Sequence, residues 1–599
     1  MQPKRKSFLG TIFRGLFFGQ REVMSMMEEE QIQSPTRTIA RNFFARKLTK
    51  IGLAFFTLML LIVIILPFFF PLDEAFFDTT MGNRRPSFNM MRFPRALDNG
   101  NAAYISAGSG FGVGVTQAGN VHVWGQTGLT GLDQIPAPMG RVIQVSAGMD
   151  HALALNAHGQ VFTWGNPNFN LPNIPPDIQG RTIYVAAGVQ YSAALTDDGI
   201  VHVWGNDGVM RANINPRLQA GRPARHIVAN ITTVMLLLED NTIMHLSPRQ
   251  PAIGEFPDWI QGQIVDIALT DGTGAALLMD GTVVAWGDIT AESIHVPDHI
   301  QGRVVEIDGG RWHFTAILDD GSLYSWGNNF FGQLNVPTIS NAAYIFPGFH
   351  HNYVIDTNGN IRTWGLNGFL MGSDELGRDV FVRFLSAGRI SMTVGVIAVI
   401  IAAFIGITLG GISGYFGGKI DMFLMRFSEI WGSIPFLPLA ILLSHIIGRN
   451  LGQIGRLIVI MVVLGILTWP ALFRLVRGQL LQARENEYVI AARALGVTEL
   501  RIIFKHIFPN IISVISVWLA LNLAGSMLTE STLSFIGFGV SEPTPSWGNM
   551  LTGANNTIVL RQFWWRWIFP AIALTTVTLS INIIGDGLRE AIDPRAQER

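Results

Sequence analysis

The sequence has no cysteine and little charge. Asp, Glu, Lys and Arg make up 14% of its 599 residues. Without cysteine the chain has no disulfide scaffold, thiol catalysis or cysteine-zinc site. The charged fraction is far below the roughly 25% of soluble domains, which excludes a disordered, coiled-coil or ordinary cytosolic chain. The formal net charge of −1 argues against bulk nucleic-acid binding.

Lysine is also missing from the whole stretch between Lys50 and Lys419. The first part of this stretch, Ile51–Phe70, is a run of twenty uncharged residues, which is long enough to span the ~30 Å hydrocarbon core of a bilayer. The residues that follow it are more polar. Five further candidate spans follow, at Ser391–Gly414, Trp431–Ile447, Leu457–Phe473, Ile511–Phe538 and Trp567–Gly585. The sequence therefore predicts six membrane spans, with a long polar segment between the first two.

Basic residues indicate the orientation of these spans. Ten Lys or Arg precede Ile51, and six more lie between Arg474 and Lys505, after the fourth span. The positive-inside rule places both segments in the cytoplasm. Six crossings then return the C-terminus to the cytoplasm and put the long polar segment outside.

The long polar segment contains an internal repeat. Trp-Gly pairs begin at Trp124, Trp164, Trp204, Trp286, Trp326 and Trp364, with spacings of 40, 40, 82, 40 and 38. The double spacing leaves room for one degenerate copy, with Leu246 in place of Trp. A turn residue stands five positions before each: Gly119, Gly159, Gly199, Asn241, Gly281, Gly321 and Gly359. Seven units of ~40 residues with short strands and tight turns predict a seven-bladed β-propeller, whose tryptophans anchor the blades.

Eleven of the thirteen histidines lie in this repeat region and raise the question of metal binding. Three of them, His151, His313 and His351, share one repeat position, so the repeat itself explains them and we predict no metal site. The copy "SAGMDHALALNAHGQVFTWG" resembles the repeat of the regulator of chromosome condensation (RCC1-like) family, and the resemblance covers about residues 96–368. Acidic residues outnumber arginines about two to one there, so no nucleic-acid partner is expected.

A second motif lies between the fourth and fifth predicted spans, over residues 485–510. Tyr488–Leu495 is a good helix former, Gly496 is expected to end it, and a second helix is expected to run to a break at Pro509. Such a short helix, with the small residues Ala491, Ala492 and Ala494 and basic flanks, suits docking in a groove of another protein. The alternative is an ordinary loop between spans.

This loop resembles the EAA motif of binding-protein-dependent ABC importer permeases. The motif places are occupied by Ile490-Ala491-Ala492, Gly496 and Ile507-Phe508-Pro509. Ile490 replaces the usual Glu and Phe508 the usual Leu. Four further stretches resemble the C-type permease subunit of dipeptide, oligopeptide and nickel importers: "GSDELGRD" (372–379), "GYFGGKIDMFLMR" (414–426), "LSFIGFGVSEPTPSWGNML" (533–551) and "NIIGDGLREAIDPR" (582–595). The resemblance covers about 36–75 and 369–599.

The resemblance implies a polytopic α-helical membrane protein of the type I ABC importer fold, with an inserted all-β propeller. The expected parts are a cytoplasmic segment (1–50), a first transmembrane helix (51–71), an extracytoplasmic propeller (96–368) and a permease domain (369–599). Its expected setting is a bacterial plasma (inner) membrane, without a cofactor. Its expected partners are the lipid bilayer, a second permease subunit, two ATPase subunits and an extracytoplasmic solute-binding protein.

No bond chemistry is expected of this chain. A G-x-x-x-x-G-K-[ST] phosphate loop is missing, since Gly418-Lys419 is followed by Ile420. The resemblance implies a permease subunit that forms half of a pathway for peptides or similar small solutes, with the propeller docking a binding protein or ligand. Candidate residues for ATPase coupling are Ala491, Ala492, Arg493, Gly496 and Pro509, and those for polar contacts in the bundle are Glu530 and Asp586. The alternative is a membrane-anchored propeller receptor or adhesion protein without transport activity.

Overall fold

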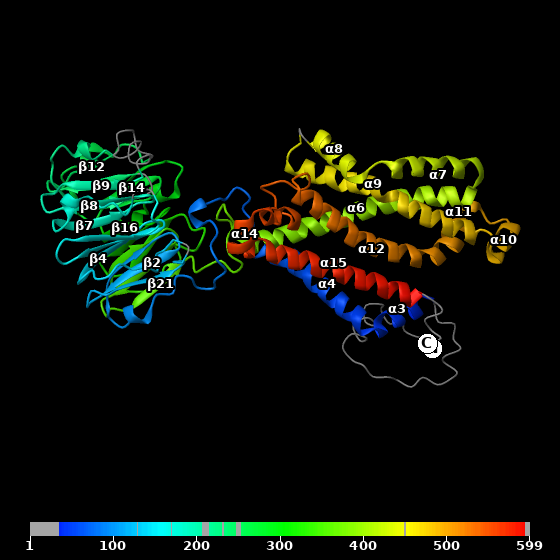
Figure 1. The fold of residues 1–599 in the computed structure, drawn as a ribbon, viewed down its shortest axis with the longest axis horizontal. Coiled ribbons are helices and arrows are strands. Elements are labelled where there is room, and N and C mark those ends of the chain that lie inside the picture. The colour runs from blue at the N-terminus through cyan, green and yellow to red at the C-terminus, as the bar shows by residue number, and fades with distance from the viewer. Residues whose placement is uncertain are drawn as a thin grey trace. The chain divides into compact units, whose positions relative to one another are not determined.

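The computed structural model describes residues 35–128, 130–168, 171–206, 215–230, 233–246, 253–448 and 451–592. Most of the predicted cytoplasmic segment therefore lies outside the described residues. The chain forms two compact units, one of Met1–Phe76 with Asp379–Arg599 and the other of Phe77–Arg378. The first unit is helical and the second is built of β-sheets (Figure 1).

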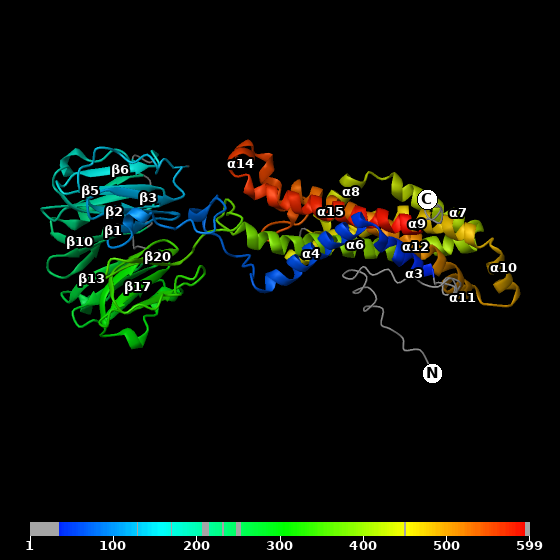
Figure 2. The ribbon, with the colours of Figure 1, turned by 90° about the horizontal axis from the view of Figure 1, so that it is seen from below.

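Five described helices are long and apolar enough to cross a membrane. They are α4 (Lys47–Ile65), α6 (Val380–Phe416), α9 (Gln453–Ala483), α12 (Phe508–Phe535) and α15 (Trp565–Ile592). Their side chains are mostly apolar, and a helix satisfies its own backbone hydrogen bonds. Both properties are needed in the hydrocarbon core of a bilayer. The helices α4 and α15 lie side by side (Figures 1 and 2). A Cβ atom on Gly587 of α15 would come within 2.4 Å of Thr49 Oγ1, so glycine is what permits this close packing.

The third predicted span, Trp431–Ile447, is not one continuous helix. It covers the end of α7 (Gly418–Ser433) and most of α8 (Phe436–Gly448), and these two helices are bent by 84°. The break falls at Ile434, whose ψ of 130° is extended. The following Pro435 explains it, because proline disfavours the helical conformation of the residue before it. The described helices thus give five crossings, or six if the bent pair is counted as one span.

Shorter helices complete this unit. They are α3 (Pro35–Ala45), α10 (Glu487–Ala494), α11 (Glu499–Arg501), the π-helical turn η9 (Ile502–Ile507), α13 (Trp547–Met550) and α14 (Thr557–Gln562). The helix α3 precedes the first membrane helix, and α10 and α11 lie between α9 and α12 in the chain.

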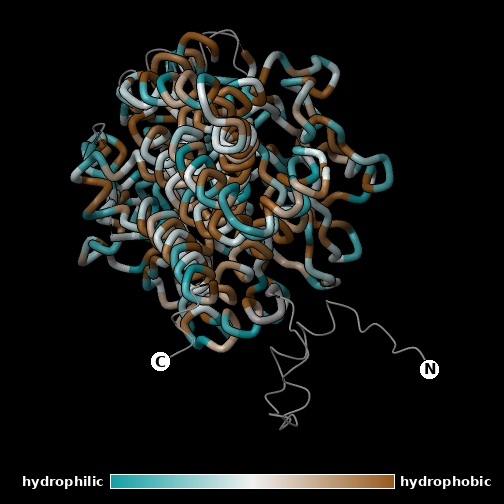
Figure 3. Tube along the Cα trace, turned by 90° about the vertical axis from the view of Figure 1, so that its right-hand side faces the viewer, coloured by the Kyte–Doolittle hydropathy of each residue, from teal (hydrophilic) through white to brown (hydrophobic). Residues whose placement is uncertain are grey.

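The second unit contains seven antiparallel sheets of three strands each, in chain order, which confirms the predicted seven blades. The strands are β1 (Ala102–Ala107), β2 (Phe111–Thr116), β3 (Val121–Gly125), β4 (Val142–Ala147), β5 (His151–Asn156), β6 (Val161–Gly165), β7 (Thr182–Ala187), β8 (Tyr191–Thr196), β9 (Val201–Gly205), β10 (Ala224–Ala229), β11 (Val234–Leu238), β12 (Ile243–His245), β13 (Ile264–Leu269), β14 (Thr273–Leu278), β15 (Val283–Gly287), β16 (Val304–Gly309), β17 (His313–Leu318), β18 (Leu323–Gly327), β19 (Ala342–Pro347), β20 (His351–Asp356) and β21 (Ile361–Gly365). Figure 3 shows how hydrophobic and hydrophilic residues are distributed along the Cα trace of the chain.

The hairpin between the second and third strand of every blade uses the predicted turn residue. All seven have positive φ, from +62° at Asn241 to +87° at Gly119. Asn241 takes the left-handed conformation in the degenerate blade, and Asn is the residue that replaces Gly there at the lowest cost. The repeat pattern therefore marks a conformational requirement of the backbone.

Neighbouring blades approach closely at the glycine that follows the first strand in five of the seven blades. A Cβ atom on Gly148 would lie 2.4 Å from the carbonyl oxygen of Gly188 in the next blade. The repeated histidines lie beside this contact. His151 Nε2 is 3.1 Å from Ser192 Oγ of the next blade, and its fully buried ring explains why the position repeats.

The propeller closes where its last blade meets its first. The N–H of Gly100 donates to the carbonyl of Gly359 at 3.0 Å. Trp124 of the first blade donates its indole N–H to the Tyr353 hydroxyl of the last blade at 2.8 Å, and this hydroxyl donates to the carbonyl of Met91 at 2.8 Å. Closure thus uses side chains and a preceding segment, since in the described part of the chain each end blade is built from three consecutive strands of its own.

The segments that enter and leave this unit run side by side. Asp78 N–H donates to Leu376 O at 2.7 Å, and Ser373 N–H donates to Arg84 O at 2.9 Å. We call residues 77–84 together with 373–378 the stem. The stem belongs to the β-sheet unit and brings the two ends of the insertion together.

Candidate functional site

The loop over residues 485–510 forms a short helix held at one end of the helical unit (Figures 1 and 2). The helix α10 ends at Ala494, and Gly496 follows with φ of +75°. Positive φ favours glycine at this place after a helix. A Cβ atom on Gly496 would meet nothing within 4 Å, so only backbone conformation, and not space, calls for glycine here.

One face of α10 is packed into the helical unit. Val489 and Ala492 are buried at 0% and 7% exposure. They join a hydrophobic cluster with Leu480 at the end of α9, Ile502 of η9 and Tyr415 at the end of α6. The packed face thus belongs to one cluster with the ends of α6 and α9 and with η9.

The opposite face of α10 is exposed and mostly apolar. Ile490 is 53% exposed and Leu495 is 83% exposed, and Ala491 lies exposed between them in the chain. Residues three and four apart share a helix face, so Ile490 and Ala494 form one exposed apolar patch. Exposed apolar surface of this kind indicates a contact site for a partner.

Arg493 connects α10 to the end of α6. Its guanidinium lies 5.7 Å from the centre of the Tyr415 ring, and Nη2 donates to the Tyr415 hydroxyl at 3.3 Å. Its Nε also lies 3.8 Å from Glu499 Oε1. A nearby ion pair joins α7 and α9: Arg477 Nη2 donates to Asp421 Oδ2 at 2.6 Å. No sequence pattern points to Tyr415 or Asp421, because their partners lie 78 and 56 residues away in the chain.

The sequence predicts a helix break at Pro509, but the structure has none there. Pro509 lies in the first turn of α12, which begins at Phe508 directly after the π-helical turn η9. An interior proline lacks an N–H and clashes with the carbonyl four residues earlier. The wider π-helical turn of Ile502–Ile507 comes just before the proline, where such a clash arises, so the helix continues.

Glu530 and Asp586 have different surroundings. Glu530 is fully buried in α12 and accepts hydrogen bonds from Ser534 Oγ at 2.7 Å and Ser391 Oγ at 3.0 Å. Ser391 also accepts the Trp547 N–H at 3.1 Å, so the network joins α6, α12 and α13. Asp586 is exposed on α15, and its carboxylate forms no ion pair within the part of the chain that the structure describes.

The six repeated tryptophans are all buried, at 4–7% exposure. Four indole N–H groups donate to a backbone carbonyl of the connection that precedes their blade; Trp164, for example, bonds Leu132 O at 3.1 Å. Trp124 bonds Tyr353 at the closure, and the Trp286 N–H has no partner among the described residues. The described His, Asp and Glu residues form no group of three that could hold a metal ion.

Three family models match this chain. The model described as "Binding-protein-dependent transport system inner membrane component" matches residues 406–598, and "N-terminal TM domain of oligopeptide transport permease C" matches residues 34–86. The model "Regulator of chromosome condensation (RCC1) repeat" matches residues 142–170 and 304–333. The first model falls on the helical unit, the second covers the first membrane helix and continues into the stem, and the third falls on two blades.

Relatives of similar sequence match the helical part. The oligopeptide transport system permease protein OppC of Haemophilus influenzae is 40% identical over 260 residues, 43% of this chain and 80% of the relative. The dipeptide transport system permease protein DppC of Bacillus subtilis is 42% identical over 224 residues, 37% of this chain and 68% of the relative. The solved structure of Prp20p from Saccharomyces cerevisiae is 18% identical with a TM-score of 0.32, over 44% of this chain and 82% of that one.

The family models agree with the geometry of each unit. Long apolar helices make this a multi-pass membrane protein, and the permease family is non-catalytic. A binding-protein-dependent system implies separate ATPase and binding-protein partners. The chain belongs to the family of binding-protein-dependent transport system inner membrane components, the permease subunits of ABC importers, and carries an inserted seven-bladed propeller with RCC1 repeats.

Proposed function

We propose that this chain forms half of the translocation pathway of a peptide importer, and that separate ATPase subunits drive it by docking on α10. The observation that carries the proposal is the division of α10 into one face packed in a cluster with the ends of α6 and α9 and with η9, and one exposed apolar face. The peptide class rests on the relatives, which are named as dipeptide and oligopeptide permeases.

The contacts of α10 suggest how docking would move the bundle. A push on α10 would be passed to α6 through Arg493 and Tyr415, and to α9 and α12 through Val489 and Ala492. Packed helices shift as rigid bodies rather than deform, because interiors are close-packed. ATP-driven closure of the partners would thus rock the helices between inward- and outward-facing states.

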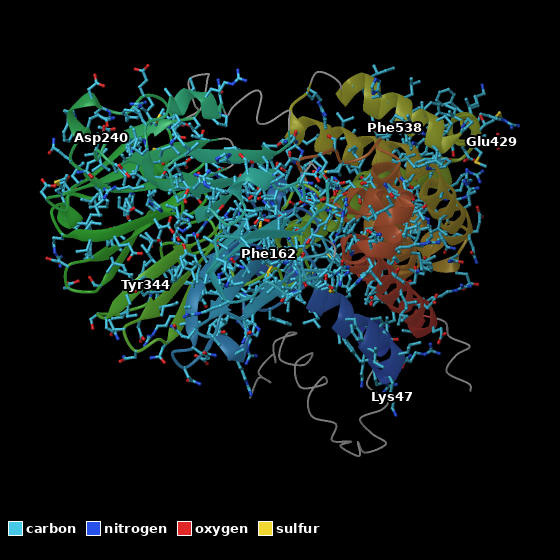
Figure 4. The ribbon with its side chains drawn as sticks, turned by 60° about the vertical axis from the view of Figure 1, so that its left-hand side comes forward. Lys47, Phe162, Asp240, Tyr344, Glu429 and Phe538 are labelled. Atoms are coloured by element: carbon cyan, nitrogen blue, oxygen red, sulfur yellow. The ribbon has the colours of Figure 1, made fainter. Side chains whose placement is uncertain are left out.

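The proposed orientation puts α10 in the cytoplasm and the propeller outside. The start of α4 at Lys47, labelled in Figure 4, carries basic residues, and so does the segment around α10. Both lie towards the same end of the helical unit (Figures 1 and 2), as the positive-inside rule requires of two cytoplasmic segments. The second permease subunit would complete the pathway, and the N- and C-termini would both be cytoplasmic.

Docking is tested by placing a bulky side chain on the exposed face of α10. Ala491→Trp should abolish peptide uptake in proteoliposomes that contain the complete complex, and should weaken binding of the ATPase subunits. The matched control is Ala96→Trp, also at an exposed alanine but in the propeller unit. Normal uptake by Ala491→Trp would refute docking through this face.

The propeller is proposed to dock the solute-binding protein or its ligand. Because the stem brings the insertion's ends together, residues 85–372 can be replaced by a short Gly-Ser linker that keeps the stem. The complete complex should then take up peptide more slowly or with a lower affinity. If uptake were unchanged, the alternative of a receptor or adhesion role for the propeller would hold.

A further inference from the structure

The central channel of the propeller has two different ends. The first strands of the blades (β1, β4, β7, β10, β13, β16 and β19) contact one another from blade to blade and enclose a channel of about 160 Å³. Each first strand has six residues, and all seven strands run in the same direction along the channel. Equivalent positions therefore form rings, and each ring can be read from the sequence.

One end of the channel is covered by the chain's own stem. Asp78 accepts a hydrogen bond from His350 Nε2 at 2.6 Å and forms an ion pair with Arg311. Arg84 Nη2 donates to Ser109 Oγ at 2.5 Å. His350, Arg311 and Ser109 all come directly after first strands, so the stem occupies the end at which these strands finish. A partner must therefore approach the other end.

The other end, where the first strands begin, is ringed by the residues at the second position of each first strand. Four of these seven residues are apolar and 41–58% exposed: Ile143, Ile183, Val265 and Val305. Ala103 and Ala343 are half-buried, and the exposed Arg225 of β10 donates to the carbonyl of Ile264 at 3.1 Å. A β-bulge in every blade falls at this position and leaves the residue without a direct partner. Trp259 and Met279, both about 60% exposed, adjoin β13 at the same end. We call the four exposed apolar ring residues, together with Trp259 and Met279, the mouth.

Acidic side chains lie just inside the mouth. Asp266 and Glu306 occupy the third position of neighbouring first strands, and Asp308 lies two residues further in. His226 Nδ1 is 3.7 Å from Asp266 Oδ1, while Glu306 and Asp308 form no ion pair with any Arg or Lys of the described ranges. Burial raises the pKa of Glu306 to about 7, as expected where a carboxylate lacks a cation.

We propose that the mouth docks a polypeptide segment of a partner protein that presents a lysine or arginine between apolar residues. The apolar flanks would cover the mouth, and the cation would reach Glu306 and Asp308. Sites for whole small molecules usually measure about 300–1,000 Å³, so a channel of 160 Å³ suits a single side chain. Tyr344, exposed on the same side of the propeller as Asp240 (Figure 4), borders this end.

Charge complementarity supports this choice of partner. Acidic residues outnumber arginines about two to one over residues 96–368, and lysine is absent there. Such a surface steers basic segments towards itself, and a close charge pair adds specificity. The inference rests on the docking role proposed for the propeller and specifies the surface and the chemistry of that role.

The test uses the full-length protein in detergent and a fluorescent, acetylated and amidated heptapeptide with a central lysine flanked by leucines. Fluorescence anisotropy should show saturable binding. Replacing the lysine by norleucine should weaken it about tenfold or more, as should Glu306→Gln, Asp266→Asn or Val305→Asn. The matched controls, Ile289→Asn and Glu292→Gln, change exposed residues of the loop after β15 at the stem end and should bind normally.

The proposal would be overturned if the norleucine peptide bound as tightly as the lysine peptide. It would also be overturned if Glu306→Gln, Asp266→Asn and Val305→Asn all bound the lysine peptide as tightly as the wild type. Full displacement by free cadaverine at the peptide's own concentration would overturn it as well, because the apolar residues of the mouth would then contribute nothing. Uptake by the complete complex is measured separately. If these variants lost peptide binding but the complete complex still took up substrate normally, the docking surface would be confirmed, and the propeller would have no role in transport.

Discussion

A graded series at Gly496 tests whether the shape of the α10 loop controls coupling. Gly496 has φ of +75°, and a Cβ atom there would meet nothing within 4 Å. The whole cost of a side chain is therefore the left-handed backbone, roughly 1–2 kcal/mol for alanine, less for Asn and more for a β-branched residue. An energy of this size lowers the population of the docking conformation by a factor of roughly 5–30.

Binding of the ATPase subunits and peptide-stimulated ATP hydrolysis by the reconstituted complex should therefore fall in the order Gly, Asn, Ala, Val. The control is Gly478 of α9, where a Cβ atom also meets nothing within 4 Å but φ is helical. Gly478→Ala should be neutral, or stabilising by up to about 1 kcal/mol. The reasoning is refuted if the Gly496 variants equal wild type, or if Asn, Ala and Val reduce coupling to the same extent.

Three further predictions concern single side chains. Ile490→Glu places a carboxylate on the exposed apolar face of α10 and should lower stimulated ATP hydrolysis, because that face is proposed to dock the ATPase subunits; hydrolysis at or above the wild-type rate would show that docking does not need the apolar residue. Trp124→Phe removes a buried hydrogen bond to Tyr353 and should destabilise the propeller by about 1–3 kcal/mol in denaturant unfolding, whereas Trp286→Phe should cost less because that N–H has no partner among the described residues. Burial lowers the pKa of His351 to about 3, so its contribution to stability is complete above pH ~6.5 and is lost as the pH falls towards 3; His351→Phe should make the fall in Tm below pH 6.5 shallower, and an unchanged slope would contradict this.

The sequence predicted the features that depend on short spacings. The seven hairpin turns follow from one residue type at a fixed distance from Trp, and the membrane helices follow from uninterrupted apolar runs. The break at Ile434 was missed because the apolar run continues through Pro435, although that proline is the signal that locates it.

Contacts between distant segments were beyond reach of the sequence. Nothing near Arg493 indicates that Tyr415 lies beneath it, and nothing near Glu530 indicates the hydroxyl of Ser391, 139 residues earlier. The two faces of α10 were likewise hidden, since Ala491 and Ala492 are the same residue type and only packing buries one of them. The mouth of the propeller depends on the register of the first strands in successive blades, which the sequence does not show.

The stem has a consequence for how such a chain could arise and be rebuilt. Asp78 and Leu376 are joined by a 2.7 Å backbone hydrogen bond. The two ends of the 300-residue insertion are therefore as close together as the two strands at the end of a hairpin. A hairpin tip tolerates insertions at little thermodynamic cost, and loop-closure entropy grows only slowly with length. The propeller can therefore be gained by a gene fusion at one loop and lost by a deletion at the same loop. We expect related permeases to tolerate its insertion at that loop.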